Sequence, residues 1–468
     1  MQLSISAILK QVMLAMSASI GYLTIGLVRG FSSPAIPSLK QNNPELVPSE
    51  DAVSWISAIP PLGALFGSLV CGPLMQNFGP RRTLLISTPV FVAAWIYIAF
   101  SPTWQNLVAA RFFTGFAVGI VLPSAQLYVS DCSLPQIRGM VGSLPALFMA
   151  AGILVAYIFG SFLKWQTLAL SCAAFPAILL CLLCFLPESP VWLQGKGHFD
   201  KAEASLIWLH RKPNIDETEM GTVNQQNNGV TEDKEVISNE SKDRAEIAAP
   251  LWSKQVLVPF SLVVAILVFQ QISGIDSIVF YTVTIFQESG STLGEYAATI
   301  LVGFVQLIAT IISIFLIDYF GRKPLLLTSG LFMSLAMIGL GTYFYLYVRG
   351  KASTLGLLPL ISQLIFIASY SIGYCSIPFI LMGELLPLKY RSLLSSISGA
   401  FNLGSMFVVI KTFPDLADVL GSAGAFWIYA LCCFISCIFV YFFLPETKGK
   451  TLEDIQRYFV LKFPHKKL

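Results

Sequence analysis

The sequence predicts an all-α membrane protein with twelve transmembrane helices in two pseudo-symmetric six-helix bundles. Three observations point to this fold: a mean hydropathy of +0.72, a charged fraction of only 12%, and twelve long apolar runs in 468 residues. A soluble domain has about 25% charged residues, because polar side chains must cover its surface. A helix needs about 20 apolar residues to cross the hydrocarbon core. The runs have this length and lack the two-residue alternation of strands.

The apolar runs form two groups of six. The first group covers residues 9–31, 53–75, 83–101, 105–129, 140–162 and 166–186. The second covers residues 255–286, 296–317, 324–348, 355–382, 393–413 and 422–444. The first run begins with Lys10, as a signal peptide would, but no convincing small-residue cleavage site follows it. We therefore expect a retained helix there.

A polar interval separates the two groups. Within it, residues 200–211 have the pattern of a short amphipathic helix, and residues 213–246 carry too few apolar side chains to fold alone. This division predicts four parts. They are an N-terminal bundle at 1–186, a cytosolic linker at 187–254 with short helices and a disordered stretch, a C-terminal bundle at 255–445, and a cytosolic tail at 446–468.

The basic residues of the short loops predict the orientation. Most of them lie in loops that join an even-numbered run to the next odd one, and such loops are cytosolic by the positive-inside rule. An even number of crossings then places both termini and the linker in the cytosol, so the sequon at Asn239 stays unglycosylated. The tail shows no retention signal, so we expect a multi-pass protein of the plasma membrane.

Composition and motifs exclude several other functions. A formal charge of +3 is too small to indicate a nucleic-acid partner. Eight of the nine cysteines lie in apolar runs, which indicates neither a metal site nor a disulfide framework. The three histidines lie in polar segments, and no phosphate-binding loop of the form GxxxxGK[ST] occurs. We therefore expect no enzyme, cofactor or metal.

The two groups of runs end in the same chemistry. Gly79-Pro80-Arg81-Arg82 follows the second run, and Gly321-Arg322-Lys323 follows the eighth. Phe185-Leu186-Pro187-Glu188-Ser189 closes the sixth run, and Phe443-Leu444-Pro445-Glu446-Thr447 closes the twelfth. Matched ends on one face indicate two parallel halves that are related by an axis along the membrane normal.

Acidic residues occupy matched cytosolic positions as well. Asp131 precedes Arg138 by seven residues, and Glu384 precedes Arg391 by the same spacing. Topogenesis alone would explain the cations but not these acids. We interpret the groups as a charged latch whose ion pairs form when the cytosolic side is shut and break when the halves move apart. Partly exposed pairs of this kind stabilise by only about 0–1 kcal/mol each, which suits a gate that opens repeatedly.

The motifs, taken in order, resemble those of the sugar porters of the major facilitator superfamily. The residues that carry the resemblance are Asp318-Tyr319-Phe320-Gly321-Arg322-Lys323, the spaced set Arg111, Gly115 and Gly119, Pro187–Pro190, Gln270–Ile275 and Pro445–Gly449. The local sequences Arg29–Pro34 and Lys411–Phe413 are similar to those of insect facilitated trehalose transporters. The resemblance spans nearly the whole chain and implies the major facilitator fold. With it, the predicted cytosolic latch comprises Arg81, Arg111, Asp131, Arg138, Glu188, Asp318, Arg322, Glu384, Arg391 and Glu446.

A sugar site needs amide groups, which both donate and accept hydrogen bonds, beside apolar surface. Gln270 and Gln271 precede Ser273-Gly274, where a helix can break. The resemblance implies sugar contacts for both of them and for Gln306 and Asn402. The alternative for all four is hydrogen bonding between helices without substrate. Phe280, Tyr281, Tyr374 and Phe379 are candidate wall or gate residues, although aromatic residues in membrane helices also serve as packing.

The chain departs from the family pattern at several positions. Gln76 stands where an acid is usual and Pro80 where an arginine is usual, which predicts a weaker latch in the first half. Asp131 replaces a glutamate, Phe379 replaces a tryptophan, and Ala146 replaces an amide. Fewer hydrogen bonds and more apolar wall change substrate preference, so glucose is not assured as the substrate.

Two departures concern proton coupling. Proton-driven relatives carry an aspartate in the first helix, and the matching residue here is Ser32, which cannot titrate. Asp276 stands where the motif has asparagine, which places a carboxylate beside the expected cavity and adds it to the candidate substrate-binding residues. Arg29 is costly inside a bilayer unless it pairs or snorkels. We hypothesise that Arg29 and Asp276 face one cavity and neutralise each other.

These observations predict a facilitative sugar transporter for trehalose or a hexose. It would work by alternating access as a monomer in a lipid bilayer, with a central binding site and no nucleic-acid partner. Three alternatives stay open: a proton-coupled sugar symporter, a sugar receptor of the same fold that does not transport, and a carrier of a non-sugar solute. The sequence alone does not rank trehalose, glucose, fructose and polyols.

Overall fold

The computed structural model describes residues 5–133, 138–210, 251–289, 294–351, 355–387, 390–450 and 452–462. The expected disordered stretch at 213–246 and its sequon at Asn239 lie outside these residues. The described part is helical, as its long apolar runs predict.

The N-terminal half contains six long helices. They are α1 (Ile5–Asn42), α2 (Glu50–Phe78), α3 (Pro80–Ala99), α4 (Trp104–Cys132), α5 (Arg138–Gly160) and α6 (Trp165–Phe185), with the 3-10 turn η1 (Pro44–Leu46) between the first two. Two short helices follow, α7 (Pro190–Gly195) and α8 (Phe199–His210). The helix α8 corresponds to the amphipathic segment expected at 200–211. It packs on α1 and α7, and the Lys10 ammonium donates to the Trp208 carbonyl at 2.9 Å.

The C-terminal half has broken helices. Its elements are α11 (Lys254–Ile272), α12 (Ile275–Ser289), α13 (Glu295–Phe320), α14 (Arg322–Val348), α15 (Leu358–Ile372), α16 (Ile377–Leu385), α17 (Arg391–Phe443) and the tail helix α18 (Leu452–Lys462). The pairs α11 with α12 and α15 with α16 each make one crossing. In α17 a positive φ of 73° at Gly421 separates two segments, each long enough to span a bilayer.

Twelve crossings follow from these helices. Among the described residues, eleven helices are long and apolar enough to cross a membrane, and α17 supplies two crossings in one of them. The predicted major facilitator architecture of six and six is thus confirmed. The element α17 shows why a count of helices falls short of the number of crossings: its two segments are separated only by the non-helical backbone at Gly421.

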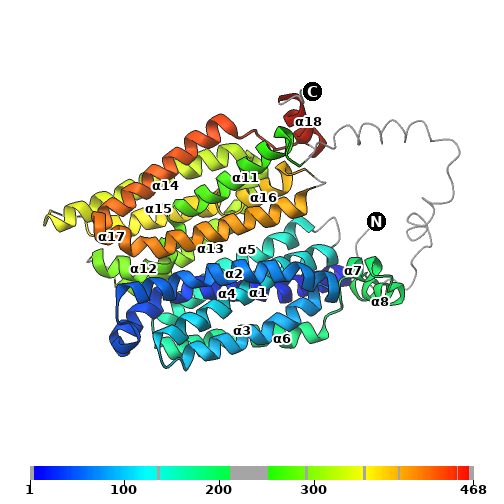
Figure 1. The fold of residues 1–468 in the computed structure, drawn as a ribbon, viewed down its shortest axis with the longest axis horizontal. Helices are drawn as coiled ribbons and strands as arrows, with labels where there is room; N and C mark the ends of the chain where they lie inside the picture. Colours follow the sequence, from blue (N-terminus) through cyan, green and yellow to red (C-terminus); the bar gives the residue numbers. More distant parts are fainter. Residues whose placement is uncertain are drawn as a thin grey trace.

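The two halves form separate bundles that run side by side (Figure 1). One buried apolar cluster lies in the N-terminal half, and a second, centred in the C-terminal half, extends to Ile36, Val53, Ala58, Ile153 and Tyr157 of the N-terminal half. Three helix pairs pack across the interface: α2 on α17, α5 on α13, and α1 on α12. The elements α7, α8 and α18 lie at one end of the molecule (Figure 1). The basic loops predict that this end is cytosolic, and we name it the cytosolic end on that prediction.

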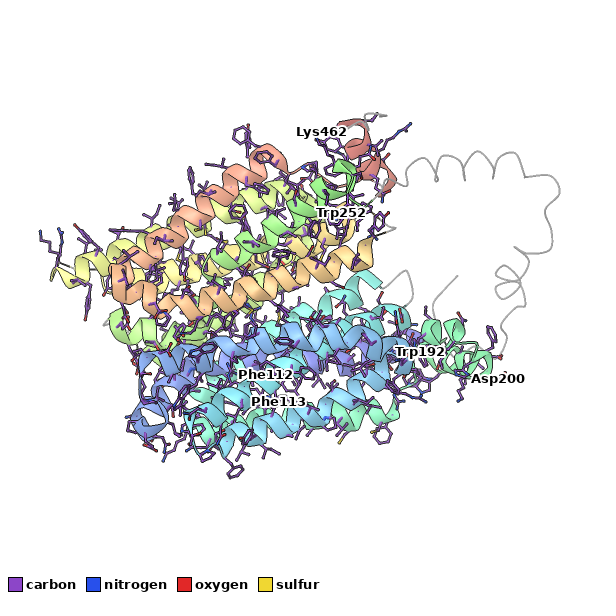
Figure 2. The ribbon with its side chains drawn as sticks, in the orientation of Figure 1. Phe112, Phe113, Trp192, Asp200, Trp252 and Lys462 are labelled. Carbon is purple, nitrogen blue, oxygen red and sulfur yellow. The ribbon has the colours of Figure 1, made fainter. Side chains whose placement is uncertain are left out.

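Apolar side chains cover the outside of both bundles along their length (Figure 2). Phe113 on α4 is half-exposed there, whereas Asp200 and Lys462 lie at the cytosolic end. An exposed apolar surface of this extent fits a lipid environment, because hydrocarbon solvates such side chains and water does not.

Candidate functional site

The centre of the C-terminal half is built around the break between α11 and α12. Gln270 and Gln271 end α11, and Gly274 takes a φ of 84° that lets the chain turn into α12. A Cβ at Gly274 would lie 2.3 Å from the Tyr429 ring, so only glycine fits this approach. The Ser273 hydroxyl donates to the Gln270 carbonyl at 2.7 Å, which satisfies one carbonyl that the break releases.

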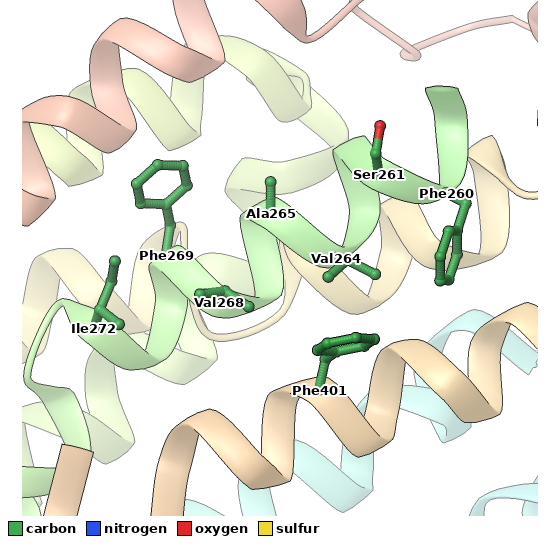
Figure 3. A pocket seen from close by; sticks show the side chains of 8 residues that line it. All are labelled: Phe260, Ser261, Val264, Ala265, Val268, Phe269, Ile272 and Phe401. Atoms are coloured by element: carbon green, nitrogen blue, oxygen red, sulfur yellow. The ribbon is translucent and has the colours of Figure 1, made fainter. Parts of the chain in front are cut away.

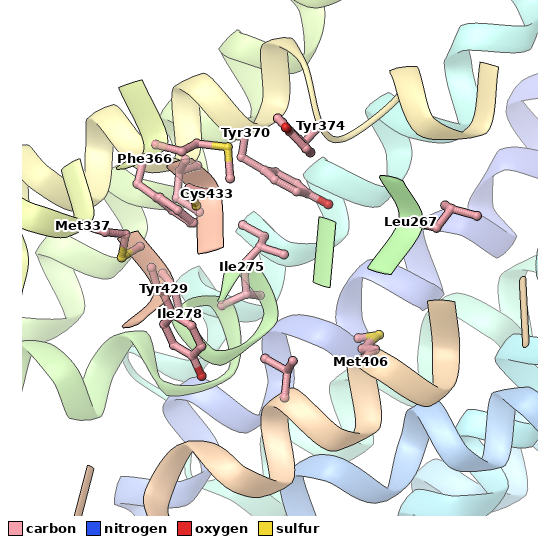
Figure 4. Packing of buried hydrophobic residues seen from close by; sticks show 14 of the residues in the cluster. Leu267, Ile275, Ile278, Met337, Phe366, Tyr370, Tyr374, Met406, Tyr429 and Cys433 are labelled. Carbon is pink, nitrogen blue, oxygen red and sulfur yellow. The ribbon is translucent and has the colours of Figure 1, made fainter. Parts of the chain in front are cut away.

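A second break, between α15 and α16, faces the first. The Gln270 amide donates to the Tyr374 carbonyl at 2.7 Å and to the Tyr370 hydroxyl at 3.3 Å. Figure 4 shows both tyrosines on the segment that faces α11. An unpaired carbonyl is costly inside a bilayer, so Gln270 stabilises the unwound backbone of the second break. The Tyr374 hydroxyl is itself bonded to Ser436 at 2.6 Å.

Asn402 on α17 completes the hydrogen bonding of Gln270. Its amide donates to the Gln270 side-chain oxygen at 2.9 Å and to the Leu267 carbonyl at 3.1 Å. Both amides are buried. Gln270 and Asn402 therefore hold three helices together, which is the structural role that the sequence analysis left open for them.

Gln271 and Gln306 differ from that pair. Their exposed fractions are only 4% and 5%, yet the side-chain oxygen of each has no hydrogen-bond partner among the described residues. Buried amide oxygens are normally bonded, so these two acceptors are available to a polar ligand or to water. Among the four candidate amides, Gln271 and Gln306 are therefore the two whose side-chain oxygens can still accept a hydrogen bond.

Sequence reasoning missed a further amide, Gln363 on α15. It is fully buried, and neither its side-chain oxygen nor its nitrogen has a partner. The sequence did contain a signal for Gln363, because this residue lies within the apolar run 355–382. A polar side chain inside a membrane helix is the feature that selected Gln306.

The candidate residues share one depth. Arg29 and Asp276 each lie thirteen residues from the outer end of their helix, and Gln306 lies eleven residues from its own. At 1.5 Å per residue these positions are about 17–20 Å from the outer end. Residues from both halves thus meet near mid-membrane.

Arg29 and Asp276 form an ion pair between the halves, in agreement with the hypothesis that they neutralise each other. Asp276 is fully buried, and the Arg29 side chain is 17% exposed. Arg29 also contacts the Met149 sulfur at 4.0 Å. Within the part of the chain that the structure describes, one Asp276 oxygen and the Arg29 Nε have no hydrogen-bond partner.

Arg111 does not lie where the sequence analysis grouped it. It is seven residues from the outer end of α4, about 30 Å from the cytosolic end at 1.5 Å per residue. Its guanidinium donates to the Ser32 hydroxyl at 2.6 Å and to the carbonyls of Val28 and Ile56. Arg111 is therefore an internal residue of the N-terminal half, bonded to the position where proton-driven relatives carry an acid.

The aromatic candidates divide into packed and exposed side chains. Phe280 is buried in the core of the C-terminal half, and Tyr281 lies against Phe413 with ring centroids 5.3 Å apart. The backbone of Tyr281 departs from helical geometry, which marks a kink in α12. Phe379 on α16 is 45% exposed. Their roles as wall or gate residues stay predictions.

The outer ends of the halves are joined by Lys411, a residue that sequence reasoning did not single out for this. Its ammonium donates to Asp51 at 2.6 Å and to the Ser54 hydroxyl at 2.7 Å, both on α2. The ammonium also lies over the Trp55 ring, 5.2 Å from its centroid. Basic residues on the outer side were counted only for topology, so the pattern gave no sign of this contact.

The cytosolic charges of the C-terminal half connect its own helices. The Arg322 guanidinium donates to Glu384 at 2.8 Å. The Glu446 carboxylate accepts from the backbone N–H groups of Arg322 and Lys323, at 3.1 and 2.9 Å. These groups begin α14, so Glu446 caps that helix from a distant part of the chain. The turn before them is Gly321, with a φ of 92°, and a Cβ there would lie 3.1 Å from the Glu446 carboxyl carbon.

The N-terminal half repeats this arrangement with one change. The Glu188 carboxylate accepts from the N–H groups of Arg81 and Arg82, at 2.9 and 3.2 Å, next to Gly79 with a φ of 88°. Pro80 occupies the place of Arg322, so this half has neither the N–H group nor the guanidinium of that position. The Arg81 side chain instead donates to the Leu183 and Cys184 carbonyls.

The two capping carboxylates have opposite pKa directions. Burial raises the pKa of Glu188 above its ordinary value, although three backbone N–H groups oppose the shift. At Glu446 burial is outweighed by four backbone N–H donors, and its pKa lies below the ordinary value. Backbone donors stabilise the ionised form, so the half with the additional donor keeps its carboxylate charged to lower pH.

The contacts described for these charges lie within one half, not between the halves. Asp131 accepts from the Ser189 hydroxyl at 2.7 Å, and the Arg391 side chain donates to the nearby Leu386 carbonyl at 3.4 Å. The side chains of Arg138 and Asp318 lie outside the described residues. A contact inside a half persists when the halves separate, so the pairs seen here brace each half and do not connect the two.

One apolar groove lies on the outside of the C-terminal half. It has a volume of about 400 Å³ and is lined by seven residues of α11 together with Phe401 of α17 (Figure 3). Its one hydroxyl, on Ser261, is bonded to the Val258 carbonyl of its own helix. The groove offers no free polar group to a sugar and lies on the opposite side of α11 from the Gln270 hydrogen bonds. It is a lipid-facing packing defect and not the candidate site.

Comparison with known proteins identifies relatives over almost the whole chain. The family described as Sugar (and other) transporter matches residues 14–459. The Facilitated trehalose transporter Tret1 of Drosophila virilis is 38% identical over 450 residues, which cover 96% of this chain and 48% of that protein. Trehalose transporter 1 of Drosophila melanogaster is 39% identical over 450 residues, covering 96% of this chain and 51% of that protein. The chain thus spans about half the length of the curated relatives it matches.

Solved structures show the same fold. The inward-open xylose transporter XylE from E. coli has a TM-score of 0.76 at 23% identity, covering 96% of this chain and 99% of its own. The proton:xylose symporter XylE bound to 6-bromo-6-deoxy-D-glucose has a TM-score of 0.71 at 24% identity, covering 95% of this chain and 98% of its own. At this identity the likeness shows the fold alone.

Proposed function

Because the chain belongs to the sugar transporter family, we propose that it moves a sugar across a membrane by alternating access. The sugar binds between the two halves near mid-membrane, and the halves expose it to one side at a time. No covalent bond changes, and the protein acts as a monomer of the plasma membrane with both termini in the cytosol.

The observation that carries this proposal is the pair of buried amide oxygens on Gln271 and Gln306 that have no partner. A sugar hydroxyl donates a hydrogen bond, so it satisfies such an acceptor without needing a charge. Gln270 and Asn402 hold the broken helices that carry and surround these acceptors. In this assignment Gln271 and Gln306 contact the sugar, whereas Gln270 and Asn402 position the site.

We assign the substrate to trehalose or a hexose. The Drosophila relatives are named as trehalose transporters, and a disaccharide needs acceptors spread over several helices. Gln271, Gln306 and Gln363 offer unpartnered polar atoms on three different helices of the C-terminal half.

Transport down a gradient, without protons, follows from Ser32. Arg111 bonds to a hydroxyl there, and a hydroxyl does not titrate in the physiological range. The competing function is proton-coupled symport through Asp276, which is the ionisable group beside the amides. Uptake that is unchanged between two pH values favours the uniporter. If Asp276→Asn keeps transport but abolishes a pH dependence seen in the wild type, the symporter is correct.

Uptake of labelled trehalose, glucose, fructose and a polyol into proteoliposomes tests the proposal. We expect saturable uptake of one of them, and an increased KM in Gln271→Ala because an acceptor is lost. Ser261→Ala is the matched control, since it lies on the same helix α11 but lines the outer groove. An unchanged KM in Gln271→Ala removes this residue from the site. Binding without exchange of labelled sugar would indicate a receptor, and inhibition only by non-sugar solutes would indicate a different cargo.

A further inference from the structure

The ion pair between Arg29 and Asp276 joins the two halves inside the membrane. Arg29 belongs to α1 in the N-terminal half, and Asp276 belongs to the first turn of α12 in the C-terminal half. Any motion that separates α1 from α12 must separate these two charges. Both lie away from bulk water, so their separation is costly unless something else solvates them.

This pair is the innermost of several contacts along one face of α12. The Val279 carbonyl accepts from the Tyr157 hydroxyl at 2.9 Å, and the Val283 N–H donates to the Ser33 hydroxyl at 3.0 Å. Residues 276, 279 and 283 follow one another at helical spacing and run from mid-membrane to the outer end. Together they hold the outer side closed, and Asp276 is the member nearest Gln271.

The pair also has unused hydrogen-bonding capacity. One Asp276 oxygen accepts no hydrogen bond from the described residues, and the Arg29 Nε donates none to them. Tyr370, which bonds Gln270, interacts electrostatically with Arg29, so the pair adjoins the amide cluster. A sugar hydroxyl both donates and accepts, and neighbouring hydroxyls of one ring therefore match a free carboxylate oxygen beside a free guanidinium N–H.

We propose that the Arg29–Asp276 ion pair couples the presence of sugar to the opening of the outer side. In the empty carrier the pair holds α1 against α12. A bound sugar hydrogen-bonds to both charged groups and replaces part of their mutual attraction, which lowers the barrier to separating them. The proposal rests on the proposed function, and it adds that the loaded carrier changes state faster than the empty one.

Two measurements on the full chain test this coupling. In proteoliposomes with saturating labelled sugar, we expect equilibrium exchange to exceed net uptake by roughly three- to tenfold, because net uptake includes the return of the empty carrier. In the double variant Arg29→Met with Asp276→Asn, the charges are gone and no partner is left buried alone. We expect the ratio of exchange to net uptake to fall toward one.

The second measurement needs no substrate. Spin labels at Gln105 and Val348, exposed at the outer ends of α4 and α14, report the separation of the halves in a background without the native cysteines. We expect the double variant to populate the longer distance several-fold more than the wild type in the absence of sugar. The single variant Arg29→Met also breaks the pair and leaves Asp276 buried alone, so we expect it to populate the longer distance at least as much as the double variant.

The outcomes separate the two proposals. If no sugar is taken up but the distance distribution shifts in the double variant, the proposed function fails and the conformational role of the pair stands. If sugar is taken up but both the distance distribution and the exchange ratio match those of the wild type, the ion pair is only structural and the coupling is wrong. A melting temperature close to that of the wild type shows that the double variant is folded.

Discussion

Gly321 is the position where a single methyl group tests the capping arrangement on the cytosolic side. Its backbone has a φ of 92° and a ψ of 173°, a region that is essentially confined to glycine. An alanine Cβ would also lie 3.1 Å from the Glu446 carboxyl carbon, which is closer than ordinary packing allows. Gly321→Ala therefore strains the turn and displaces the carboxylate that caps α14.

The magnitude follows from these two effects. Forcing a residue with a side chain into this backbone region costs of order 1–3 kcal/mol. Losing a helix cap costs about 1 kcal/mol. For a unit of the size of one half, 1 kcal/mol corresponds to about 2–4 °C in Tm. We expect Gly321→Ala to lower the Tm of the purified protein by roughly 5–10 °C, as read from tryptophan fluorescence during heating.

Two glycines provide matched controls. Gly350 has a φ of 68° and no atom within 4 Å of a built Cβ, so Gly350→Ala measures the cost of a side chain at positive φ without a close contact. Gly399, inside the helix α17, also has no atom within 4 Å, and Gly399→Ala should be neutral or slightly stabilising. Gly321→Ala must be the most destabilising of the three. If Gly321→Ala and Gly350→Ala have the same Tm, the contact with Glu446 contributes nothing and the capping argument is refuted.

Three further predictions concern protons and the outer contact. Glu446→Gln removes the ionised carboxylate of Glu446, which stabilises the folded protein at neutral pH. In the wild type this stabilisation is lost as the pH falls through the lowered pKa of Glu446. The raised pKa of Glu188 makes its carboxylate protonate at higher pH, so the Tm difference between wild type and Glu188→Gln changes at a higher pH than that for Glu446→Gln. Coincident pH profiles would contradict this order. Ser32→Asp places a carboxylate against Arg111, and we expect sugar uptake to become pH-dependent where the wild type is not; flat profiles in both proteins would exclude the position as a proton site. Lys411→Met removes the hydrogen bonds of Lys411 to Asp51 and Ser54, so a spin-label pair across the outer ends should populate longer distances. An unchanged distribution would deny that contact a gating role.

The transmembrane crossings and the repeat of motifs in the two halves could be predicted because both depend on local sequence patterns. Apolar length defines a span, and the motifs at Glu188 and Glu446 recur after matched spans. The break after Gln271 was also readable, since Ser273-Gly274 is a local signal. These features depend on residues that are close in sequence.

The partners of the polar residues could not be predicted in the same way. Nothing in the sequence shows that Gln270 is saturated by Tyr374 and Asn402, whereas Gln271 beside it has a free oxygen. Adjacent residues on a helix point about 100° apart, so two neighbouring glutamines meet different surroundings. Which of them has spare capacity depends on helices that lie over 100 residues away.

The same limit explains the misassignment of Arg111, and the charged latch stays a prediction. Sequence motifs show that acids and bases occur together at the cytosolic ends, but not whether a carboxylate reaches its own half or the other one. In the structure the Glu446 carboxylate accepts hydrogen bonds from backbone N–H groups of its own half, and Gly321 leaves the space that this carboxylate occupies. A rigid half that moves as a body needs such internal bracing, because a rocking motion transmits displacement from one end to the other only if each half keeps its shape. The contacts that change during transport are then those between the halves, and among those described, Arg29 with Asp276 is the one that adjoins the amides of the candidate site.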